Sequence, residues 1–440
     1  MTHILFVTPY YPPEKTPPAI RISETAQCLA QRGYQVTVLT TFPNFPSGIV
    51  PREYRGHRVL REARNGVKVV RVWSYITPNK GFLRRILGQL SFGCISPLLG
   101  WKHIGSPDVI IVESPPLFDA IAGRMLAWGK RVPYIFTVAD LWPEVAVQLG
   151  MLRNSLLIRL AQWLEWSTYR RASCVWAVTQ GLRDRLVARG LAPEHVFLLT
   201  NGVDVTRFRP LPHDQARAEL GWDERYTVLY AGTHGLVYAL STLLDAAEQL
   251  LARRDIHIVL VGDGVTREGL MRQAQVRQLK NVTFLDPQPH ERMPLIFAAA
   301  DVCVIPLRNV PMAALTLPAK VFEIMACARP TLLGVDGEAR RLVEQEAGAA
   351  LYVEPENAEA LVAAILFLFE HPEESTALGQ RGRAFVEARF DRQKLVDVLE
   401  EQIINVTQKP GTDVALVPVE RVSATAGMKQ SSNGKKNPTL

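Results

Sequence analysis

The chain has little cysteine, and its five cysteines show no CxxC spacing. Most of them lie among apolar residues and are typical of small core side chains in a reducing cytosol. These are Cys28, Cys174, Cys303 and Cys327. The nine histidines form no ligand pair at helical spacing, and no Asp-x-Asp pair occurs. The sequence therefore predicts neither a zinc site nor a carboxylate-held Mg²⁺ or Mn²⁺.

Long apolar runs are missing as well. No stretch of about 18 apolar residues occurs, so we expect no transmembrane helix. The nearest candidate, residues 86–101, is interrupted by Gln89, Gly93 and Pro97. The start of the chain lacks the charged and apolar regions of a cleavable signal peptide, and its pattern predicts a first β-strand instead.

Positive charge is present and unevenly distributed. The net charge is +7, yet residues 1–200 hold 24 Lys and Arg against 12 Asp and Glu, so the remainder is acidic. A basic first half indicates an anionic partner, either a nucleic acid or a phospholipid surface. We expect no nucleic acid, because no compact module interleaves basic residues with stacking aromatic residues.

Short β-rich runs alternate with helical patterns to about residue 355. Continuous Val, Ile and Leu strands between helices are typical of parallel sheets covered on both faces. The predicted strands are 4–8, 35–40, 68–73, 109–113, 134–138, 174–178 and 196–200, then 227–231, 257–262, 282–285, 302–306, 331–334 and 350–353. The predicted fold class is α/β, with two doubly wound parallel-sheet domains facing across a cleft.

The domain boundaries follow from composition. We expect a first Rossmann-like domain over 1–205 and a second over 206–385, because residues 201–223 have low periodicity and contain Pro210 and Pro212. Residues 386–407 would form a terminal helix that packs back on the first domain. Residues 408–440 are rich in small and polar residues and are expected to be disordered.

The loop after the first strand predicts an anion-binding corner. Residues 9–21 run through several prolines to Arg21, in the first turn of a helix. A positive charge there opposes the helix dipole unless it meets an anion or a carboxylate. A salt bridge to Glu24 or Glu14 is the alternative.

The loop after the fifth strand contains the sequence Asp140-Leu141-Trp142-Pro143-Glu144. Ligands collect at the carboxyl ends of strands in open parallel sheets, so Asp140 would point into the cleft. Trp142 could form a wall against a sugar or a lipid. Alternatively, Asp140 could cap the helix that starts near Pro143.

Three loops of the second half predict a phosphate and sugar site. Small residues follow two consecutive strands and would let a ligand approach backbone N–H groups. They are Gly232-Thr233-His234-Gly235 and Gly262-Asp263-Gly264. Farther along, Lys320 suits a phosphate, and Glu323 could accept hydrogen bonds from a pair of ribose hydroxyls. A solvated Lys and Glu on an ordinary helix is the alternative.

With these loops placed, the sequence resembles the retaining glycosyltransferases of family 4, which have the GT-B fold. The resemblance covers roughly residues 3–400 and points to the bacterial branch that builds surface polysaccharides, including L-fucosamine transferases. The matching sequences are Tyr10–Glu14 with Arg21, Asp140–Glu144, Asn201–Asp204, Gly262–Gly264 and Pro318–Pro330.

The resemblance implies a UDP- or GDP-linked sugar as co-substrate, no cofactor and a metal-independent reaction. Donor-binding residues would be Gly232, Thr233, His234, Gly262, Asp263, Gly264, Pro318 and Glu323, with Glu323 on the ribose. The acceptor and phosphate side would contain Ala19, Arg21, Trp142 and Glu144. Lys320 would stabilise the leaving diphosphate during front-face substitution, and Asp140 would orient the acceptor or stabilise an oxocarbenium-like state.

Two departures from the family pattern stand out. The family has two glutamates eight positions apart; Glu323 matches the second, and Leu315 occupies the first. The first loop has Thr16-Pro17-Pro18-Ala19 where the family has a glycine pair.

Two other functions use the same fold. A nucleotide-sugar epimerase would need carboxylates and histidines beside the sugar, and His234 is the one histidine in a predicted strand-end loop. The second alternative is a non-catalytic binding subunit. It stays open because Leu315 occupies the position of the family's first glutamate.

The basic first half has a candidate partner in an anionic membrane. Arg84 and Arg85 precede the apolar stretch 86–101, which suits a helix lying in a membrane face beside a lipid-linked or saccharide acceptor. A core helix with a solvated rim is the alternative. Further basic residues lie nearby: Arg52, Arg55, Arg58, Arg61, Arg64, Lys68 and Arg71. The expected location is the cytoplasm, at the inner face of the plasma membrane.

Overall fold

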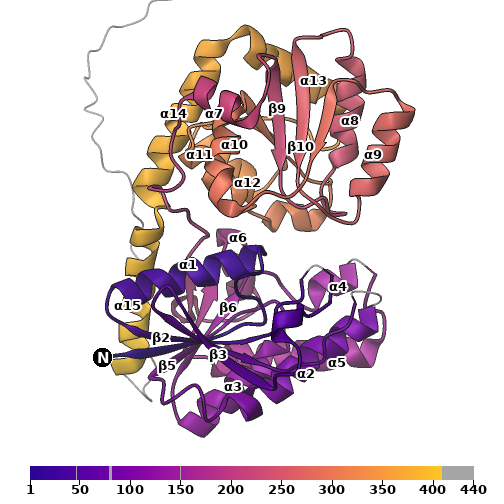
Figure 1. The fold of residues 1–440 in the computed structure, drawn as a ribbon. Helices are drawn as coiled ribbons and strands as arrows, with labels where there is room; N and C mark the ends of the chain where they lie inside the picture. The colour runs from indigo at the N-terminus through magenta and orange to yellow at the C-terminus, as the bar shows by residue number, and fades with distance from the viewer. Residues whose placement is uncertain (46, 79–81, 149, 409–440) are drawn as a thin grey trace, which may run out of the picture.

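The computed structural model describes residues 1–45, 47–78, 82–148 and 150–408 (Figure 1). It contains two α/β domains, each built on its own largely parallel sheet, which confirms the predicted fold class. The predicted tail 408–440 lies outside the described residues, apart from Gln408 at the end of the last helix.

The first sheet has the strand order β3-β4-β2-β1-β5-β6-β7-β8. Its parallel strands are β1 (His3–Val7), β2 (Gln35–Thr41), β4 (Val67–Val72), β5 (Val109–Val112), β6 (Tyr134–Val138), β7 (Cys174–Ala177) and β8 (Val196–Leu198). The chain leaves β1 in one direction for β2 and later returns to its other side with β5. Their carboxyl ends therefore flank a topological switch point, where open α/β sheets bind ligands.

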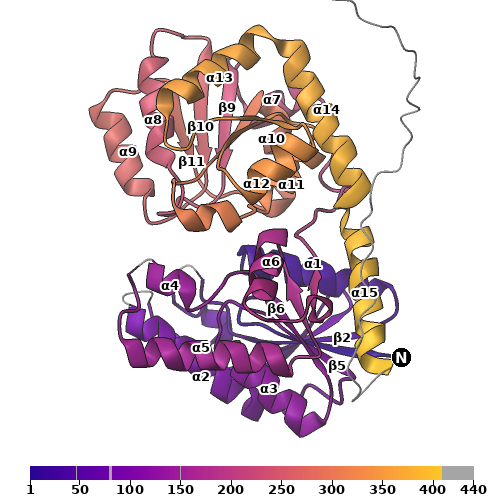
Figure 2. The same cartoon turned by 180° about the vertical axis from the view of Figure 1, so that it is seen from behind.

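Helices cover both faces of this sheet. On one face lie α2 (Phe82–Gly100), α3 (Asp119–Lys130) and α5 (Ser155–Arg171), side by side (Figures 1 and 2). The remaining helices of this domain are α1 (Pro17–Gln31), the short α4 (Glu144–Gln148) and α6 (Gln180–Ala188). Strands buried on both sides explain their continuous apolar sequences.

One edge strand was missed by the sequence analysis. Strand β3 (Val59–Arg64) pairs antiparallel with β4, and Asn65 (φ 49°) and Gly66 (φ 80°) form the turn between them. Asn-Gly is a strong hairpin signal, because both residues tolerate positive φ. The basic stretch 52–71 is therefore largely a hairpin, and Arg71 is fully buried.

The second sheet has the order β11-β10-β9-β12-β13-β14, in which all neighbours are parallel. The strands are β9 (Tyr226–Ala231), β10 (Ile256–Val261), β11 (Val282–Leu285), β12 (Val302–Pro306), β13 (Thr331–Gly334) and β14 (Ala350–Tyr352). Its helices are α7 (His213–Leu220), α8 (Leu240–Gln249), α9 (Arg267–Val276), α10 (Met293–Ala299), α11 (Lys320–Ala326), α12 (Glu338–Arg340) and α13 (Ala358–Glu370). The switch point lies between β9 and β12.

Two segments cross between the domains. The first, 199–212, leads from β8 to α7. The second is the break between α14 (Pro372–Arg389) and α15 (Arg392–Gln408), which run along one side of the molecule (Figures 1 and 2). Helix α15 buries Val396, Leu399 and Ile403 in the core of the first domain.

Among the described residues, no helix is both long and apolar enough to cross a membrane. The apolar stretch predicted from 86 onward is helix α2, which packs against α3 and carries Pro97 in its interior.

Candidate functional site

The glycine loops of the second domain lie at adjacent strand ends and pack against each other. Gly262 (φ 137°) and Gly264 (φ 155°) follow β10, and Gly232 (φ 146°) follows β9. A Cβ on Gly262 would overlap the carbonyl of Gly232, and one on Gly264 would overlap the carbonyl of His234. Hydrogen bonds from Gly232 N to Val261 O (2.9 Å) and from His234 N to the carbonyl of the β10 loop (2.8 Å) hold both loops together.

The side-chain nitrogen of Lys320 lies beside Gly232, in the first of these loops. Lys320 is the first residue of α11, and a Cβ on Gly232 would overlap its Nζ. The ammonium nitrogen lies 4.2 Å from the ring centroid of Tyr230 and 4.7 Å from that of Tyr238, out of contact with water. No hydrogen-bond partner for this nitrogen occurs in the described part of the chain. Burial lowers the pKa of Lys320 to about 7.

Glu323 lies one turn along α11 and has a partner that the sequence analysis missed. Its Oε1 lies 2.9 Å from Nε2 of His290, in the loop between β11 and α10. The statement that His234 is the one histidine in a strand-end loop was therefore wrong. The position of His290 five residues after β11 was the available signal.

The other predicted donor residues divide into buried and exposed groups. His234 is fully buried against Tyr230 and Phe284, and burial lowers its pKa to about 4, so it is neutral. The His234 ring therefore lies inside the second domain, and its donor-binding role stays a prediction. Pro318 is also buried, and its carbonyl accepts from Val321 N.

Thr233 and Asp263 are exposed at the tips of their loops. The carbonyl of Thr233 accepts a hydrogen bond from Tyr230 Oη (2.7 Å), and Oδ1 of Asp263 accepts one from Gly264 N (2.8 Å). Both contacts fix loop shape and leave the loop tips facing solvent.

In the first domain, Arg21 meets a carboxylate at the switch point. Its guanidinium is buried and forms an ion pair with Glu113, at the carboxyl end of β5, and donates to Oδ1 of Asn201 (3.0 Å). The alternative partners Glu24 and Glu14 were wrong. Glu14 instead accepts from the backbone amides of Asn44 and Phe45, and so joins the loop after β1 to the segment after β2.

Ala19 is fully buried, and its amide binds the hydroxyl of Thr16 (3.3 Å). Neither its side chain nor its amide is available to an acceptor, so its predicted role is corrected. Thr16 is the N-cap of α1, a role that this loop chemistry favours.

Asp140 lines a pocket between the domains. The first domain contributes Asp140, Leu141, Glu144, Val145, Leu182 and Arg185, and the second contributes Pro311, Leu315 and Thr316. Asp140 is exposed to this cleft, yet the surrounding protein limits its hydration and raises its pKa to about 6, opposed by Arg21. Asp140 and Leu315, both singled out in the sequence, thus form opposite walls of one pocket.

Two more residues of this loop hold its shape. Trp142 packs edge-on against Phe118 at 6.2 Å between ring centroids. Glu144 forms an ion pair with Arg185 of α6. Glu144 and Arg185 both line the pocket, so the Glu144 carboxylate is engaged by a cation of its own domain.

A further buried carboxylate lies at the start of α3. Asp119 is completely buried at the start of α3, and neither of its oxygens has a hydrogen-bond partner among the described residues. Burial, together with the nearby Glu113 carboxyl, raises its pKa well above the usual value, which favours its neutral form.

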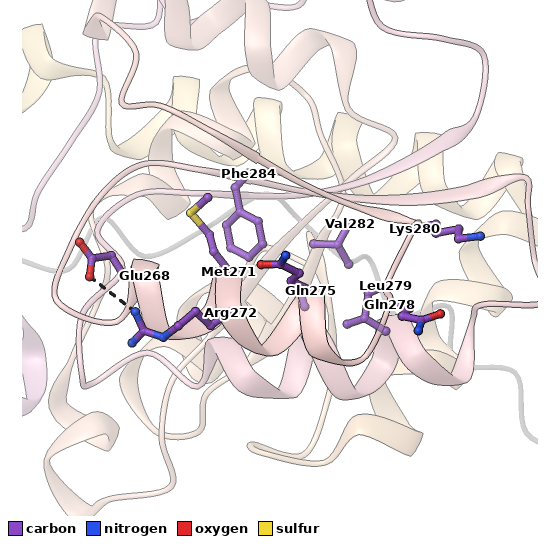
Figure 3. A pocket seen from close by; sticks show the side chains of 10 residues that line it. Glu268, Met271, Arg272, Gln275, Gln278, Leu279, Lys280, Val282 and Phe284 are labelled. Carbon is purple, nitrogen blue, oxygen red and sulfur yellow. Dashed lines mark ion pairs between the residues drawn. The ribbon is translucent and has the colours of Figure 1, made fainter.

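Another surface hollow lies away from the strand ends. It follows α9 and the edge strand β11 and is lined by surface side chains such as Met271, Gln275 and Phe284, with an ion pair between Glu268 and Arg272 (Figure 3). It is an edge-strand groove rather than a strand-end site. Across the described ranges, no group of three or more His, Cys, Asp or Glu side chains could hold a metal.

Comparisons with known proteins agree with this geometry. The family model described as "Glycosyl transferase 4-like domain" matches residues 18–202, and the model "Glycosyl transferases group 1" matches residues 225–371. The two matches fall on the first and second sheets in turn.

Named relatives match most of the chain. The WcaI glycosyl transferase of Escherichia coli (strain K12), provisionally named for colanic acid biosynthesis, is 28% identical over 402 residues, which are 88% of this chain and 96% of the relative. D-inositol 3-phosphate glycosyltransferase 1 of Catenulispora acidiphila is 28% identical over 386 residues, or 82% and 84% of the two chains.

Solved structures share the fold. Sucrose-phosphate synthase from Thermosynechococcus elongatus has a TM-score of 0.71 at 21% identity, covering 91% of this chain and 98% of that one. The Anabaena protein HepE, in complex with UDP-glucose, has a TM-score of 0.68 at 18% identity, covering 92% and 99%.

Proposed function

We propose a donor, an acceptor and a reaction course on the premise that this chain belongs to glycosyltransferase family 4 and is a glycosyltransferase with the GT-B fold. It acts in polysaccharide or glycolipid biosynthesis. In our proposal it transfers a sugar from a UDP- or GDP-linked donor, with retention, to a lipid-linked or saccharide acceptor. The observation that carries this proposal is the unpaired Lys320 ammonium below the glycine loops, at the switch point of the second sheet.

Lys320 and the glycine loops form the diphosphate site. A buried ammonium without an anion is unfavourable, and an arriving diphosphate would supply the missing charge. Gly232, Gly262 and Gly264 have no side chain, so the loops after β9 and β10 can pack closely against each other and beside the Lys320 nitrogen. Glu323 accepts hydrogen bonds from the ribose hydroxyls.

In the transfer step, the bond between the anomeric carbon and the diphosphate oxygen breaks as an acceptor oxygen bonds on the same face. Lys320 stabilises the negative charge that develops on the leaving diphosphate. The acceptor proton passes to that diphosphate, so the protein need not supply a strong base. Asp140, across the pocket from Leu315, orients the acceptor and stabilises positive charge on the sugar.

The acceptor side of the molecule suits an anionic membrane. Helices α2, α3 and α5 contain two acidic residues, Asp119 and Glu165, and both are buried. Apolar side chains exposed on these helices are Leu87, Leu98, Met125, Trp128, Leu156, Leu157, Leu160 and Trp163. Exposed basic residues on the same helices are Arg84, Arg85, Arg159, Arg170 and Arg171.

We call the solvent-facing side of α2, α3 and α5 the basic apolar face. Leu156, Leu160 and Trp163 follow each other at helical spacing along α5, so they lie on one side of that helix. Apolar residues among cations, without an exposed carboxylate on the same helices, match the interface of an anionic bilayer. The protein would thus act at the cytoplasmic face of the plasma membrane.

The transfer reaction can be tested with a panel of UDP- and GDP-sugars and lipid-diphosphate acceptors. Release of nucleoside diphosphate, dependent on acceptor, identifies the donor, and NMR of the product anomer gives the stereochemical course. We expect the product to keep the anomeric configuration of the donor. An inverted product, or a new nucleotide sugar formed without acceptor, would overturn the proposal.

A further inference from the structure

A chain of polar contacts connects the proposed ribose site to the junction between the domains. Glu323 of α11 binds His290, and His290 binds Arg207 of the crossing segment 199–212. Arg207 forms an ion pair with Glu24 of α1, in the first domain, and Glu24 also binds Arg392 at the start of α15. We call these five residues the junction relay.

The junction relay determines which ring nitrogen of His290 carries the proton. Arginine only donates hydrogen bonds, so Nδ1 of His290 must accept from Nη2 of Arg207 (3.1 Å). The ring proton therefore lies on Nε2, which donates to Oε1 of Glu323 (2.9 Å). Phe208 packs against the imidazole at 5.2 Å between ring centroids and limits its rotation. Oε1 of Glu323 is thus held in place, with Oε2 left to meet a ribose hydroxyl.

Arg207 is held in position by its own turn. Oδ1 of Asp204 accepts hydrogen bonds from the backbone amides of Thr206 (2.9 Å) and Arg207 (3.2 Å). This Asx turn follows directly after the Asn201-Gly202-Val203 segment and directs Arg207 toward both domains. Residues 201–204 match the family pattern, and their contacts at the junction between the domains were not predicted from the sequence.

Both crossings of the chain meet at the same place. Val203 N donates to Phe390 O (3.0 Å), and Arg392 N donates to Val203 O (2.9 Å). The Arg392 guanidinium binds the carbonyl of Gly202 (2.6 Å) and Oε2 of Glu24 (2.9 Å). A rotation of the domains about this junction would move Glu24 relative to His290, and Arg207 bridges the two.

We propose that His290 is a positioning residue that orients Glu323 and, through Arg207 and Glu24, couples ribose binding to the relative orientation of the domains. Ribose binding at Glu323 favours the orientation in which the relay is intact. In that orientation Asp140 and Leu315 face each other across the acceptor pocket. The donor then prepares the acceptor side before any acceptor binds.

Two variants separate the two contacts of His290. In His290→Gln the side-chain amide can still donate to Glu323 but lacks an acceptor at the Nδ1 position. In His290→Asn an oxygen near the Nδ1 position can still accept from Arg207, but the contact with Glu323 is lost. Glu24→Gln weakens the far end of the relay without touching the nucleotide site.

The experiment measures nucleotide affinity by calorimetry and domain orientation by small-angle scattering, with and without UDP or GDP. We expect His290→Asn to bind nucleotide about tenfold more weakly than wild type. We expect His290→Gln and Glu24→Gln to bind within about threefold of wild type but to lose the nucleotide-dependent change in scattering. In steady-state kinetics, we expect His290→Asn to raise KM for the donor. We expect His290→Gln and Glu24→Gln to lower kcat instead.

This inference rests on the proposed ribose role of Glu323, and Glu323→Ala separates the two. If Glu323→Ala binds nucleotide normally, the proposed function fails. If Glu323→Ala loses binding while His290→Asn binds like wild type, the positioning role is wrong. Suppose that Glu323→Ala and His290→Asn both lose nucleotide binding, but His290→Gln and Glu24→Gln keep the nucleotide-dependent change in scattering. The proposed coupling between ribose binding and domain orientation is then wrong.

Discussion

At the scale of single residues, Lys320 has the most unusual environment in the proposed site. The folded protein holds its pKa at about 7, far below the ordinary lysine value of 10.5, because its nitrogen is buried without a hydrogen-bond partner among the described residues. Between these values the unfolded chain binds more protons, so the stability of the ligand-free protein contributed by this group rises with pH. A bound diphosphate would reverse this preference by stabilising the charged form.

We expect Lys320→Met to lose nucleoside diphosphate binding while being at least as stable as wild type without ligand, because it removes a buried ammonium. In wild type, diphosphate affinity should fall by up to about tenfold for each pH unit above 7, since binding must then take up a proton. Calorimetry at several pH values measures both effects. Undiminished wild-type affinity at pH 9 would contradict the role of this lysine.

The titration of Asp140 should determine how kcat depends on pH under acidic conditions. Its pKa of about 6 means that it loses its negative charge as the pH falls below 6. If the carboxylate stabilises the sugar in the transition state, kcat should decline below pH 6. Asp140→Asn should lower kcat by about 10²-fold or more above pH 6, and this deficit relative to wild type should shrink as the pH falls. Steady-state kinetics from pH 5 to 8 provides the measurement. If kcat of Asp140→Asn still declined below pH 6, the decline would belong to the titration of another group.

Residue identities could be predicted better than residue partners. Arg21 and Asp140 were predicted as site residues from loops that follow strands, and Lys320 and Glu323 from a loop that runs into a helix. The sequence did not predict that Arg21 pairs with Glu113 or that Glu323 pairs with His290. These contacts join residues far apart in the chain, and their geometry depends on how helices settle against the sheet.

At the scale of elements, the two glycine loops depend on their lack of side chains. Gly262→Ala would place a Cβ against the carbonyl of Gly232 at a positive φ, and both loops would have to move apart. We expect a loss of about 2–3 kcal/mol of stability and of diphosphate binding.

Gly269→Ala is a matched control for this substitution. Gly269 lies within α9, where an added Cβ meets no atom within 4 Å. Alanine favours the helix, so this variant should gain up to about 1 kcal/mol and keep nucleotide binding. Chemical denaturation of both variants measures the contrast; equal stability of the two would show that the loops are not tightly packed.

Strands buried on both faces were predicted from the sequence, and the edge hairpin was missed. Continuous Val, Ile and Leu runs marked the buried strands to within one or two residues at each end. Strand β3 was hidden because an edge strand with Arg61 and Arg64 lacks an apolar run. Its turn, Asn65-Gly66, carried the missing signal.

At the scale of the whole molecule, the basic apolar face predicts membrane binding that salt weakens. Liposome flotation with anionic lipid should recover the protein at low ionic strength, and recovery should drop in high salt. Leu160→Ser with Trp163→Ser should reduce recovery several-fold. Val276→Ser is the control, because Val276 is 83% exposed on α9 in the other domain. Equal flotation of the variant and wild type would exclude α5 from the interface.

The central claim is that a nucleoside diphosphate binds at the switch point of the second sheet, between Lys320 and Glu323. The most direct test is a thermal-shift panel of UDP, GDP, ADP and dTDP on wild type, Glu323→Ala and the surface control Glu268→Ala. At a hundred times Kd, we expect one nucleotide to raise Tm by about 4 °C or more in wild type and control, but not in Glu323→Ala. An equal shift in all three proteins, or no shift with any nucleotide, would contradict the account.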